Sequence, residues 1–316
     1  MLHGGVMQKI VFVFAWAASI AGVYAAEPQH WAYPIVVERP IAPGSDDTGP
    51  LQIPGSSRSY TGVQIDDLSN PPDWFPDSHA PAPNVVRAGA GKSVPACGAC
   101  HLMSGMGHPE SSHLAGLPAQ YILRQIADFR SGARKEPTRM NGIVKDLTDD
   151  DARQAAEWFS ALKPLQWTKV VETDTVAVTY LGKGRMRFVA AEGGSEPLGS
   201  RIIEVPQDPV NAARRDPRNG FVAYVPPGSI KRGEAIVRSG SRGVMSCVIC
   251  HGAALQGIGD APPIAGISPL YAFRQLHGFQ TGARAGVWSS QMLTVVANLS
   301  EEEMISIAAY LGTLAP

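Results

Sequence analysis

Two stretches of the sequence share one pattern: residues 97–101 are Cys-Gly-Ala-Cys-His, and residues 247–251 are Cys-Val-Ile-Cys-His. Together they contain all four cysteines of the 316-residue chain. Thiols three residues apart lie on one turn of a helix, and the histidine that follows extends from the same turn. We therefore expect two sites, each built from two thiols and one imidazole.

The Cys-x-x-Cys-His spacing is the attachment signature of haem c. It predicts two haem c groups, with His101 and His251 as iron ligands. A thioredoxin-like redox motif does not need the histidine, and it belongs to a βαβ pattern that is missing here. A zinc site of four cysteines, or two disulfides, leaves both histidines unexplained. The predicted attachment residues are Cys97, Cys100, Cys247 and Cys250.

The segments after the two motifs repeat each other at an offset of 150 residues, the same offset that relates Cys97 to Cys247. After the paired arginines the offset becomes 152, which matches Met140 with Met292. A gapped repeat this consistent predicts two copies of one domain. The matched pairs are Tyr121 and Tyr271, Arg124 and Arg274, Gln125 and Gln275, Phe129 and Phe279, and Arg134 and Arg284.

Met140 and Met292 are the only methionines that coincide under the repeat, and each precedes the final helix of its copy. A thioether is a soft axial ligand, and His/Met ligation raises the reduction potential. The alternative is a packing role in the core. The repeated position favours ligation, so the predicted iron ligands are His101, Met140, His251 and Met292. Other histidines and methionines near the motifs have no like partner and are expected to be surface or structural residues: Met103, Met106, His108, His113, Met245 and His277.

Apolar spacing predicts a middle helix in each copy, at residues 121–129 and 271–279. A final helix is predicted from Thr148 to about residue 162 and from Ser300 to about residue 311, and Ser300 with Glu303 forms a capping box. Each copy is therefore expected to be small and helical, and haem attachment and domain pairing should both matter for its folding.

Residues 1–25 are typical of a secretory signal peptide, because a lysine precedes an apolar run at 10–22 and small residues follow it. That run is shorter than the roughly 20 residues that span a bilayer. An uncleaved anchor is the alternative. We expect a periplasmic protein that does not span the membrane after cleavage. The net charge of −1 gives no reason to propose nucleic acid as a partner.

The two predicted domains span 84–164 and 228–316. Residues 26–83 form a Pro-rich arm that is expected to wrap the domains through its aromatic side chains. Residues 165–227 form an insertion, in which alternation predicts a β-hairpin of 168–180 with 185–191 and a short strand at 202–205. The insertion also holds a basic cluster that we expect to be solvated, with partner docking or haem propionates as alternatives: Arg214, Arg215 and Arg218.

The two copies resemble class I cytochrome c domains in tandem and are similar to the periplasmic dihaem cytochromes of the cytochrome c-four kind. The resemblance implies a mainly α fold, with haems near the interface of the domains. It implies that the first and last helices of each copy cross, with Gly89 meeting Trp158 and Gly233 meeting Tyr310. It also implies that the carbonyl of Pro262 holds the proximal histidine; the first copy has Ser112 there.

The predicted function is electron transfer in a respiratory chain. A dehydrogenase, a quinol-oxidising complex or a terminal oxidase would serve as donor or acceptor, and no catalytic residue is predicted. A dihaem peroxidase needs an iron with an open sixth position. Enzymes of the thiosulfate-dehydrogenase kind use a cysteine ligand, and no fifth cysteine exists. A fixed subunit of a larger dehydrogenase or oxidase complex is a further alternative.

Overall fold

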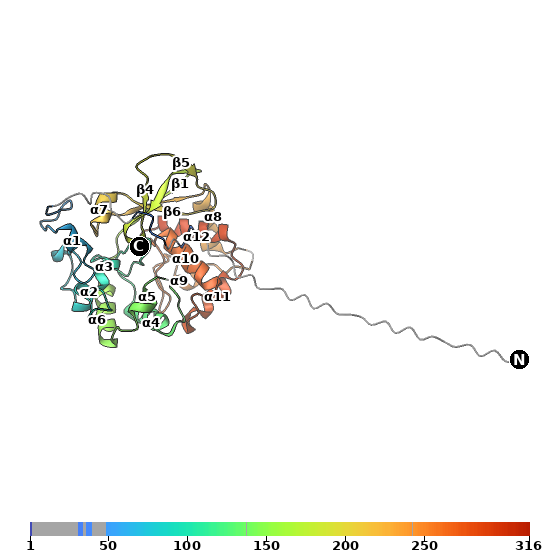
Figure 1. Cartoon of the computed structure of the whole chain (residues 1–316). Helices are drawn as coiled ribbons and strands as arrows, with labels where there is room; N and C mark the ends of the chain where they lie inside the picture. Colours follow the sequence, from blue (N-terminus) through green and yellow to red (C-terminus); the bar gives the residue numbers. More distant parts are fainter. Residues whose placement is uncertain (2–30, 34–35, 40–48, 137, 242) are drawn as a thin grey trace.

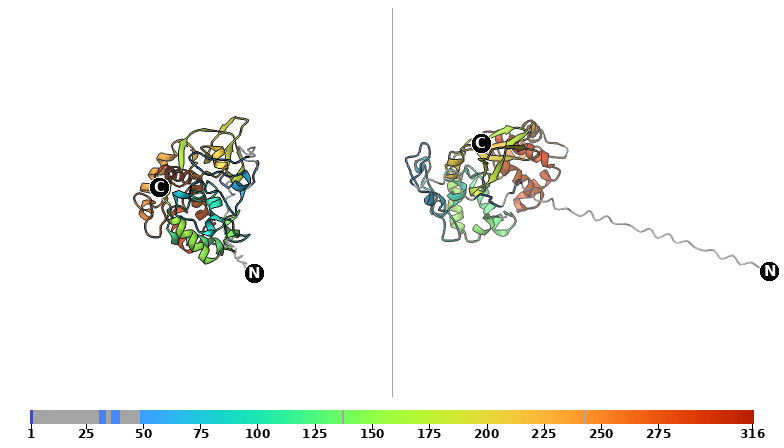
Figure 2. Two further views of the ribbon diagram at one scale, coloured as in Figure 1. Left: turned by 90° about the vertical axis from the view of Figure 1, so that its left-hand side faces the viewer. Right: turned by 45° about the horizontal axis from the view of Figure 1, so that its top comes forward.

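The computed structural model describes residues 1, 31–33, 36–39, 49–136, 138–241 and 243–316. The predicted signal peptide lies outside this part of the chain, apart from Met1. Among the described residues, no helix is long and apolar enough to cross a membrane. Helices make up most of the regular structure and the sheets are small. The repeated segments lie side by side, with the strands of the insertion above them in Figure 1, and both views of Figure 2 agree.

The first repeat, residues 84–164, is built from five helices around an apolar cluster. The cluster includes Val86, Ile122 and Phe159, all buried. The middle helix continues beyond its predicted end and stops at Gly132, which has a left-handed backbone (φ 79°). The helices are α2 (Asn84–Arg87), α3 (Cys97–His101), α4 (Ala119–Ser131), α5 (Met140–Ile143) and α6 (Asp149–Ser160).

The second repeat, residues 228–316, follows the same order with longer first and last helices. The capping box of Ser300 and Glu303 is present as predicted, and three acidic residues occupy the positive end of the last helix. That helix, α12, packs on α8. The elements are α8 (Ser229–Ser239), α9 (Val248–His251), α10 (Pro269–Gln280), η3 (Val287–Ser289), α11 (Ser290–Val296) and α12 (Glu301–Thr313).

The expected helix crossing is confirmed in the second repeat. A Cβ added to Gly233 would overlap the Ser306 carbonyl and lie 2.9 Å from Tyr310 Cβ, so only glycine fits. The first repeat differs, because α2 ends before Gly89. Gly89 has a left-handed backbone (φ 72°), and its nearest neighbours are the backbone of residues 94–96 in its own turn, not Trp158.

The insertion holds more strand than predicted. The hairpin exists but is shorter, since β3 (Thr179–Leu181) pairs only with β4 (Arg187–Val189). Residues 168–172 pair elsewhere because the alternately buried strand β7 (Phe221–Val225) offers a longer, parallel partner. The predicted strand at 202–205 is β6, antiparallel to β7. The other elements are β1 (Thr168–Glu172), β2 (Thr175–Ala177), η2 (Lys183–Arg185), β5 (Ser195–Pro197), β6 (Ile203–Pro206), α7 (Pro209–Ala213) and β7 (Phe221–Val225).

The insertion contacts both repeats. Trp167, Met186 and Phe188 pack against buried apolar side chains that follow the first Cys-x-x-Cys-His motif. The sheet instead lies on the second repeat, where Val170 joins the cluster formed by α10 and α12. The insertion therefore fixes the two repeats relative to each other.

The arm contacts both repeats as well. Trp31 lies with its ring centre 4.6 Å from that of Phe273 in α10, and the Tyr33 hydroxyl contacts His277 Nδ1 at 3.0 Å. The later part contains α1 (Gly62–Asp66) and η1 (Pro76–Ser78) and lies against the first repeat. There Trp158 of the first repeat donates its indole N–H to the Ala80 carbonyl of the arm at 3.0 Å. Trp74 of the arm, which is 1% exposed, donates its indole N–H to the Arg214 carbonyl of the insertion at 3.0 Å.

Candidate haem sites

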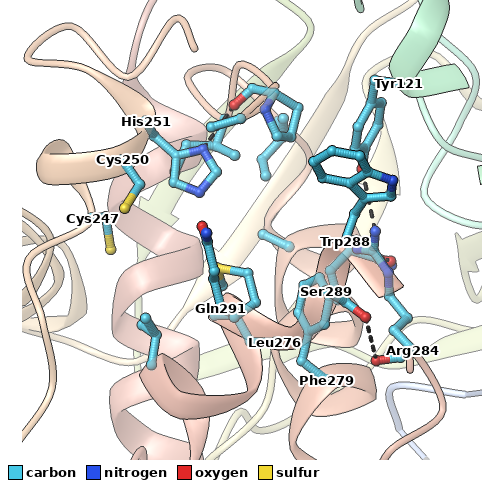
Figure 3. A pocket seen from close by; sticks show the side chains of 18 of the residues that line it. Tyr121, Cys247, Cys250, His251, Leu276, Phe279, Arg284, Trp288, Ser289 and Gln291 are labelled. Atoms are coloured by element: carbon cyan, nitrogen blue, oxygen red, sulfur yellow. Dashed lines mark hydrogen bonds between the residues drawn. The ribbon is translucent and has the colours of Figure 1, made fainter. Parts of the chain in front are cut away.

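The second motif lies at a cavity of about 570 Å³. The motif helix α9 carries His251, whose Nδ1 donates a hydrogen bond to the Pro262 carbonyl oxygen at 2.8 Å. This contact, expected from the resemblance, leaves Nε2 as the nitrogen available to a ligand. Figure 3 shows the His251 ring turned toward the cavity beside Cys247 and Cys250.

Met292 lines the same cavity, from helix α11. The structure thus brings all four predicted residues of the second site to one cavity: Cys247, Cys250, His251 and Met292. Most other lining side chains are apolar, and Leu276 and Phe279 from α10 are examples visible in Figure 3. A volume of this size falls within the roughly 300–1,000 Å³ typical of small-molecule and cofactor sites.

Polar residues from both repeats line the same cavity. Arg284 donates to the Tyr121 hydroxyl at 3.3 Å, and both residues line the cavity with Trp288. His113 of the first repeat lines it too, so it is neither on the surface nor confined to its own repeat. Sequence reasoning did not assign these residues to the site. The repeat marked Tyr121 and Arg284 by their matched partners, whereas nothing in the sequence marked His113.

The first motif forms helix α3. His101 Nδ1 donates to the Ser112 carbonyl oxygen at 2.8 Å, so the same contact is made without a proline. Met140 begins α5, whose Ile143 packs in the same cluster as Cys97. Asn141 donates to the carbonyls of Phe129 and Arg134 at 2.7 and 2.8 Å. These bonds tie the start of α5 to the end of α4.

Burial shifts the pKa values of one cysteine and of the histidine in each motif. Burial raises the pKa of the Cys97 thiol to about 12 and that of Cys247 to about 11. Burial also lowers the pKa of His101 and His251, although a carbonyl acceptor opposes this shift in each. Both rings are therefore neutral at pH 7, the form in which an imidazole binds a metal.

The four thiols remain in two separate pairs. All four cysteines are free of disulfide bonds. Among the described residues, no group of three or more His, Cys, Asp or Glu side chains could hold a metal ion, so the thiols do not assemble the zinc site considered above.

Contacts between the repeats occur in matched pairs. Arg124 pairs with Asp260 at 2.6 Å, and its counterpart Arg274 pairs with Glu110 at 2.8 Å. The other two matched arginines each donate hydrogen bonds to the tyrosine and the glutamine of the opposite repeat. Arg134 donates to Tyr271 and Gln275. Arg284 donates to Tyr121 and Gln125. The repeats therefore meet through an interface with approximate two-fold symmetry.

The comparisons with known proteins agree with this site. A family model described as cytochrome c matches residues 231–315. Cytochrome c-554(547) of Halothiobacillus neapolitanus is 35% identical over 77 residues, which cover 22% of this chain and 85% of that protein. The fold and the Cys-x-x-Cys-His sites define a c-type cytochrome, and the chain belongs to the cytochrome c family. Membership implies covalently bound haem c and electron transfer.

Two further relatives match most of the chain. Cytochrome c4 of Stutzerimonas stutzeri is 24% identical over 251 residues, 74% of this chain and 91% of that protein. The thiosulfate dehydrogenase electron acceptor of Stutzerimonas stutzeri (strain A1501) is 27% identical over 232 residues, 72% of this chain and 83% of that protein. The chain is thus similar to cytochrome c4 over both repeats, and these relatives support a carrier rather than a catalyst.

Proposed function

We propose that the chain is a periplasmic dihaem cytochrome that carries electrons between protein partners. Each repeat binds one haem c through its cysteine pair. His101 and Met140 would bind the iron in the first site, and His251 and Met292 would bind it in the second. The proposed domains are those of the sequence analysis, 84–164 and 228–316, after a signal peptide at 1–25 and an arm at 26–83, with 165–227 as an insertion between them.

The observation that carries the proposal is the second cavity. His251 is oriented by the Pro262 carbonyl, and Met292 lines the same space as the two thiols. The residues present fit a porphyrin, which is a flat apolar group with two carboxylates at one edge. Apolar side chains cover most of the cavity, and Arg284 provides a cationic, hydrogen-bonding group within it.

Arg134 and Arg284 are suited to hold the carboxylates of the cofactor. Both are less than 10% exposed, and the acceptors of their side chains across the interface are neutral tyrosine and glutamine oxygens. A buried cation requires an anion or a full set of hydrogen bonds. Two anionic carboxylates beside these guanidinium groups would supply the missing negative charge.

Bound haem supplies one-electron exchange between ferric and ferrous iron. The chain's own residues control its setting. The carbonyls of Ser112 and Pro262 fix the imidazole orientation, which is how groups around a ligand tune it. The thioethers of Met140 and Met292 would bind the iron together with the histidines, so no substrate would reach it. Apolar side chains exclude water and raise the potential.

An optical spectrum of the purified holoprotein tests the proposal. We expect two low-spin haems per chain, a near-infrared methionine–iron charge-transfer band, and no reaction with carbon monoxide or peroxide. A high-spin haem, or one that reacts with peroxide, would instead indicate a peroxidase-like enzyme.

A specific partner follows from the relatives. Two of them are named as electron acceptors of thiosulfate dehydrogenase. We propose that this chain likewise accepts electrons from an enzyme that oxidises thiosulfate, which supplies one electron per haem. Mixing the oxidised holoprotein with a purified thiosulfate dehydrogenase and thiosulfate should reduce both haems. No reduction, with an enzyme that is active toward a chemical acceptor, would exclude this donor.

A further inference from the structure

One arginine of the insertion, Arg215, reaches the first attachment helix. Its Nη1 donates to the carbonyl oxygen of Ala99, which lies in α3 between Cys97 and Cys100. Its Nε donates to the carbonyl oxygen of Ile65, in α1 of the arm, at 2.8 Å. The guanidinium group is therefore held between the arm and the helical turn that carries both attachment thiols.

The arginine cluster at 214–218 is thus not the solvated surface expected from the sequence. Arg215 is mostly buried, and Arg214 donates to the carbonyl of Gln52 in the arm at 3.0 Å. Arg218 is exposed, and its guanidinium carbon lies 3.4 Å from the centre of the Phe75 ring. The cluster fastens the arm, and one of its three cations lies buried against the first motif.

Arg215 also has a strained backbone conformation. Its φ is 59°, in the left-handed region that residues other than glycine seldom adopt. It lies just beyond the short helix α7 and the Arg214 that ends it. Strain of this kind persists only where other contacts hold the residue in place, and it often accompanies a functional role. The two hydrogen bonds of the Arg215 side chain are contacts that can hold it.

The positive charge of Arg215 is not neutralised. Among the described residues no carboxylate forms an ion pair with it, and Asp66, the acid whose charge acts on it, is already paired with Lys183. The other two groups whose charges act on Arg215 are Cys100 and Arg139. Attachment of haem converts the Cys100 thiol into an uncharged thioether, and Arg139 is itself a cation. A buried cation without a neutralising partner therefore lies beside the first haem site.

The second attachment helix lacks this environment. The residue that matches Ala99 at the offset of 150 is Ile249 in α9, which is 63% exposed, whereas Ala99 is fully buried. The contacts of Arg215 involve the first motif and the arm. Its charge should therefore act on the first haem and leave the second unaffected.

We propose that Arg215 is a positioning residue of the insertion that raises the reduction potential of the first haem, by holding a buried positive charge against its attachment helix. The inference rests on the proposed function and adds to it what sets one of the two potentials. When one electron passes from a reduced protein partner, which is thereby oxidised, to the ferric iron of the first haem, the positive charge of that site falls by one. A fixed cation favours the less positive ferrous form, and the effect is stronger where the arm excludes water.

Spectroelectrochemical titration of the full-length holoprotein tests the proposal. The two redox transitions are assigned by NMR, because haem methyl groups that contact Leu276 belong to the second cavity. Arg215→Gln should lower the ratio of ferrous to ferric first haem about tenfold at a fixed ambient potential, which is a shift of about 59 mV for a one-electron couple. The second haem should keep its wild-type potential. Arg218→Gln, which removes an exposed cation three residues further along, is the matched control and should shift neither transition.

Arg215→Lys separates the charge from the hydrogen bonds. Lysine keeps the charge, but its single ammonium group cannot reproduce the forked contacts of a guanidinium with two carbonyls. At about pH 6, where a partly buried lysine retains more of its charge, we expect a near-wild-type potential together with a lower melting temperature. Equal falls in potential in Arg215→Gln and Arg215→Lys would reduce Arg215 to a structural contact and overturn the proposal.

A further variant and the optical spectrum complete the test. Arg215→Gly removes the same charge and relieves the left-handed backbone, so it replaces Arg215→Gln if that variant does not fold. Two low-spin haems with wild-type potentials in the neutral variant would remove only the role of Arg215. A wild-type sample without two low-spin haems would remove the proposed function itself.

Discussion

Arg284 donates a hydrogen bond to the Gln125 side-chain oxygen at 2.8 Å, across the boundary between the two repeats. Its counterpart Arg134 makes the same contact with Gln275 at the same distance. Burial lowers the pKa of Arg284, and the neighbouring charge of Arg134 lowers it further. Two buried like charges therefore face each other, and the matched glutamines and tyrosines hold them in place.

Replacing Arg284 with glutamine should lower the free energy of unfolding by about 1–3 kcal/mol, because Tyr121 and Gln125 lose a charged donor. It should also lower the reduction potential of the second haem, since removal of a nearby cation favours the ferric state. Denaturant unfolding and a spectroelectrochemical titration measure the two effects. Arg153→Gln, on the exposed side of α6, is the control and should change neither.

Replacing Met292 with alanine should allow carbon monoxide to bind the second iron. It should also weaken the near-infrared methionine–iron charge-transfer band, because the second site would no longer contribute to it. Its potential should fall by on the order of a tenth of a volt or more, within the ~0.8 V range set by axial ligands. Met140→Ala should do the same at the first iron. Met245→Ala, at an exposed methionine beside the second motif, should bind no carbon monoxide. Unchanged ligand binding and potential in either of the first two variants would remove that methionine from the iron.

Stability should depend on pH through Glu204. Burial raises the pKa of this carboxyl from 4.5 to about 7, although Ser268 and the Leu270 amide donate to it. The folded state therefore favours the protonated form. The contribution of Glu204 to the unfolding free energy is complete below pH 4.5 and is lost as pH rises through 7, by about 3 kcal/mol.

Glu204→Gln cannot ionise and keeps an oxygen for the same donors. Its unfolding free energy should thus fall less than that of the wild type between pH 5 and pH 8, as measured by denaturant unfolding at each pH. Glu196→Gln, on the outer strand β5, is the control and should retain the wild-type slope. Equal slopes in Glu204→Gln and the wild type would mean that Glu204 is ionised at both pH values.

Gly233→Ala should destabilise the second repeat by about 3 kcal/mol, because the added methyl group overlaps the Ser306 carbonyl where α8 crosses α12. Thermal unfolding of the holoprotein measures the loss. Gly62→Ala is the control, since a Cβ there would meet nothing within 4 Å. A wild-type melting temperature for Gly233→Ala would show that the two helices can separate at little cost.

The features that the sequence predicted correctly are those that depend on short-range patterns. Local spacing and a strict repeat predicted the motif helices, the middle and final helices and the capping box at Ser300, and the structure has all of them. The contact of His251 with Pro262 also follows the resemblance. Axial ligation by Met140 and Met292 stays a prediction.

Several contacts between residues far apart in the sequence were not predicted. The parallel pairing of Thr168 with Phe221 joins residues that no local pattern relates, so residues 168–172 were assigned to the wrong partner. Arg215 belongs to a cluster that looks solvated, and only the fold reveals that it is held between two backbone carbonyls. The repeat did match Arg134 with Arg284, but a matched position does not show which side chains contact the other repeat.

The contact between Trp31 and Phe273 imposes an order on assembly. The two residues are far apart in the chain, and the Arg274 guanidinium adds a bond to the Ala32 carbonyl beside them. During synthesis the arm emerges long before the helix that receives it. Its aromatic side chains have no partner until α10 has formed, and closing so long a loop is slow. A stretch that is synthesised before both repeats is therefore among the last to reach its native position.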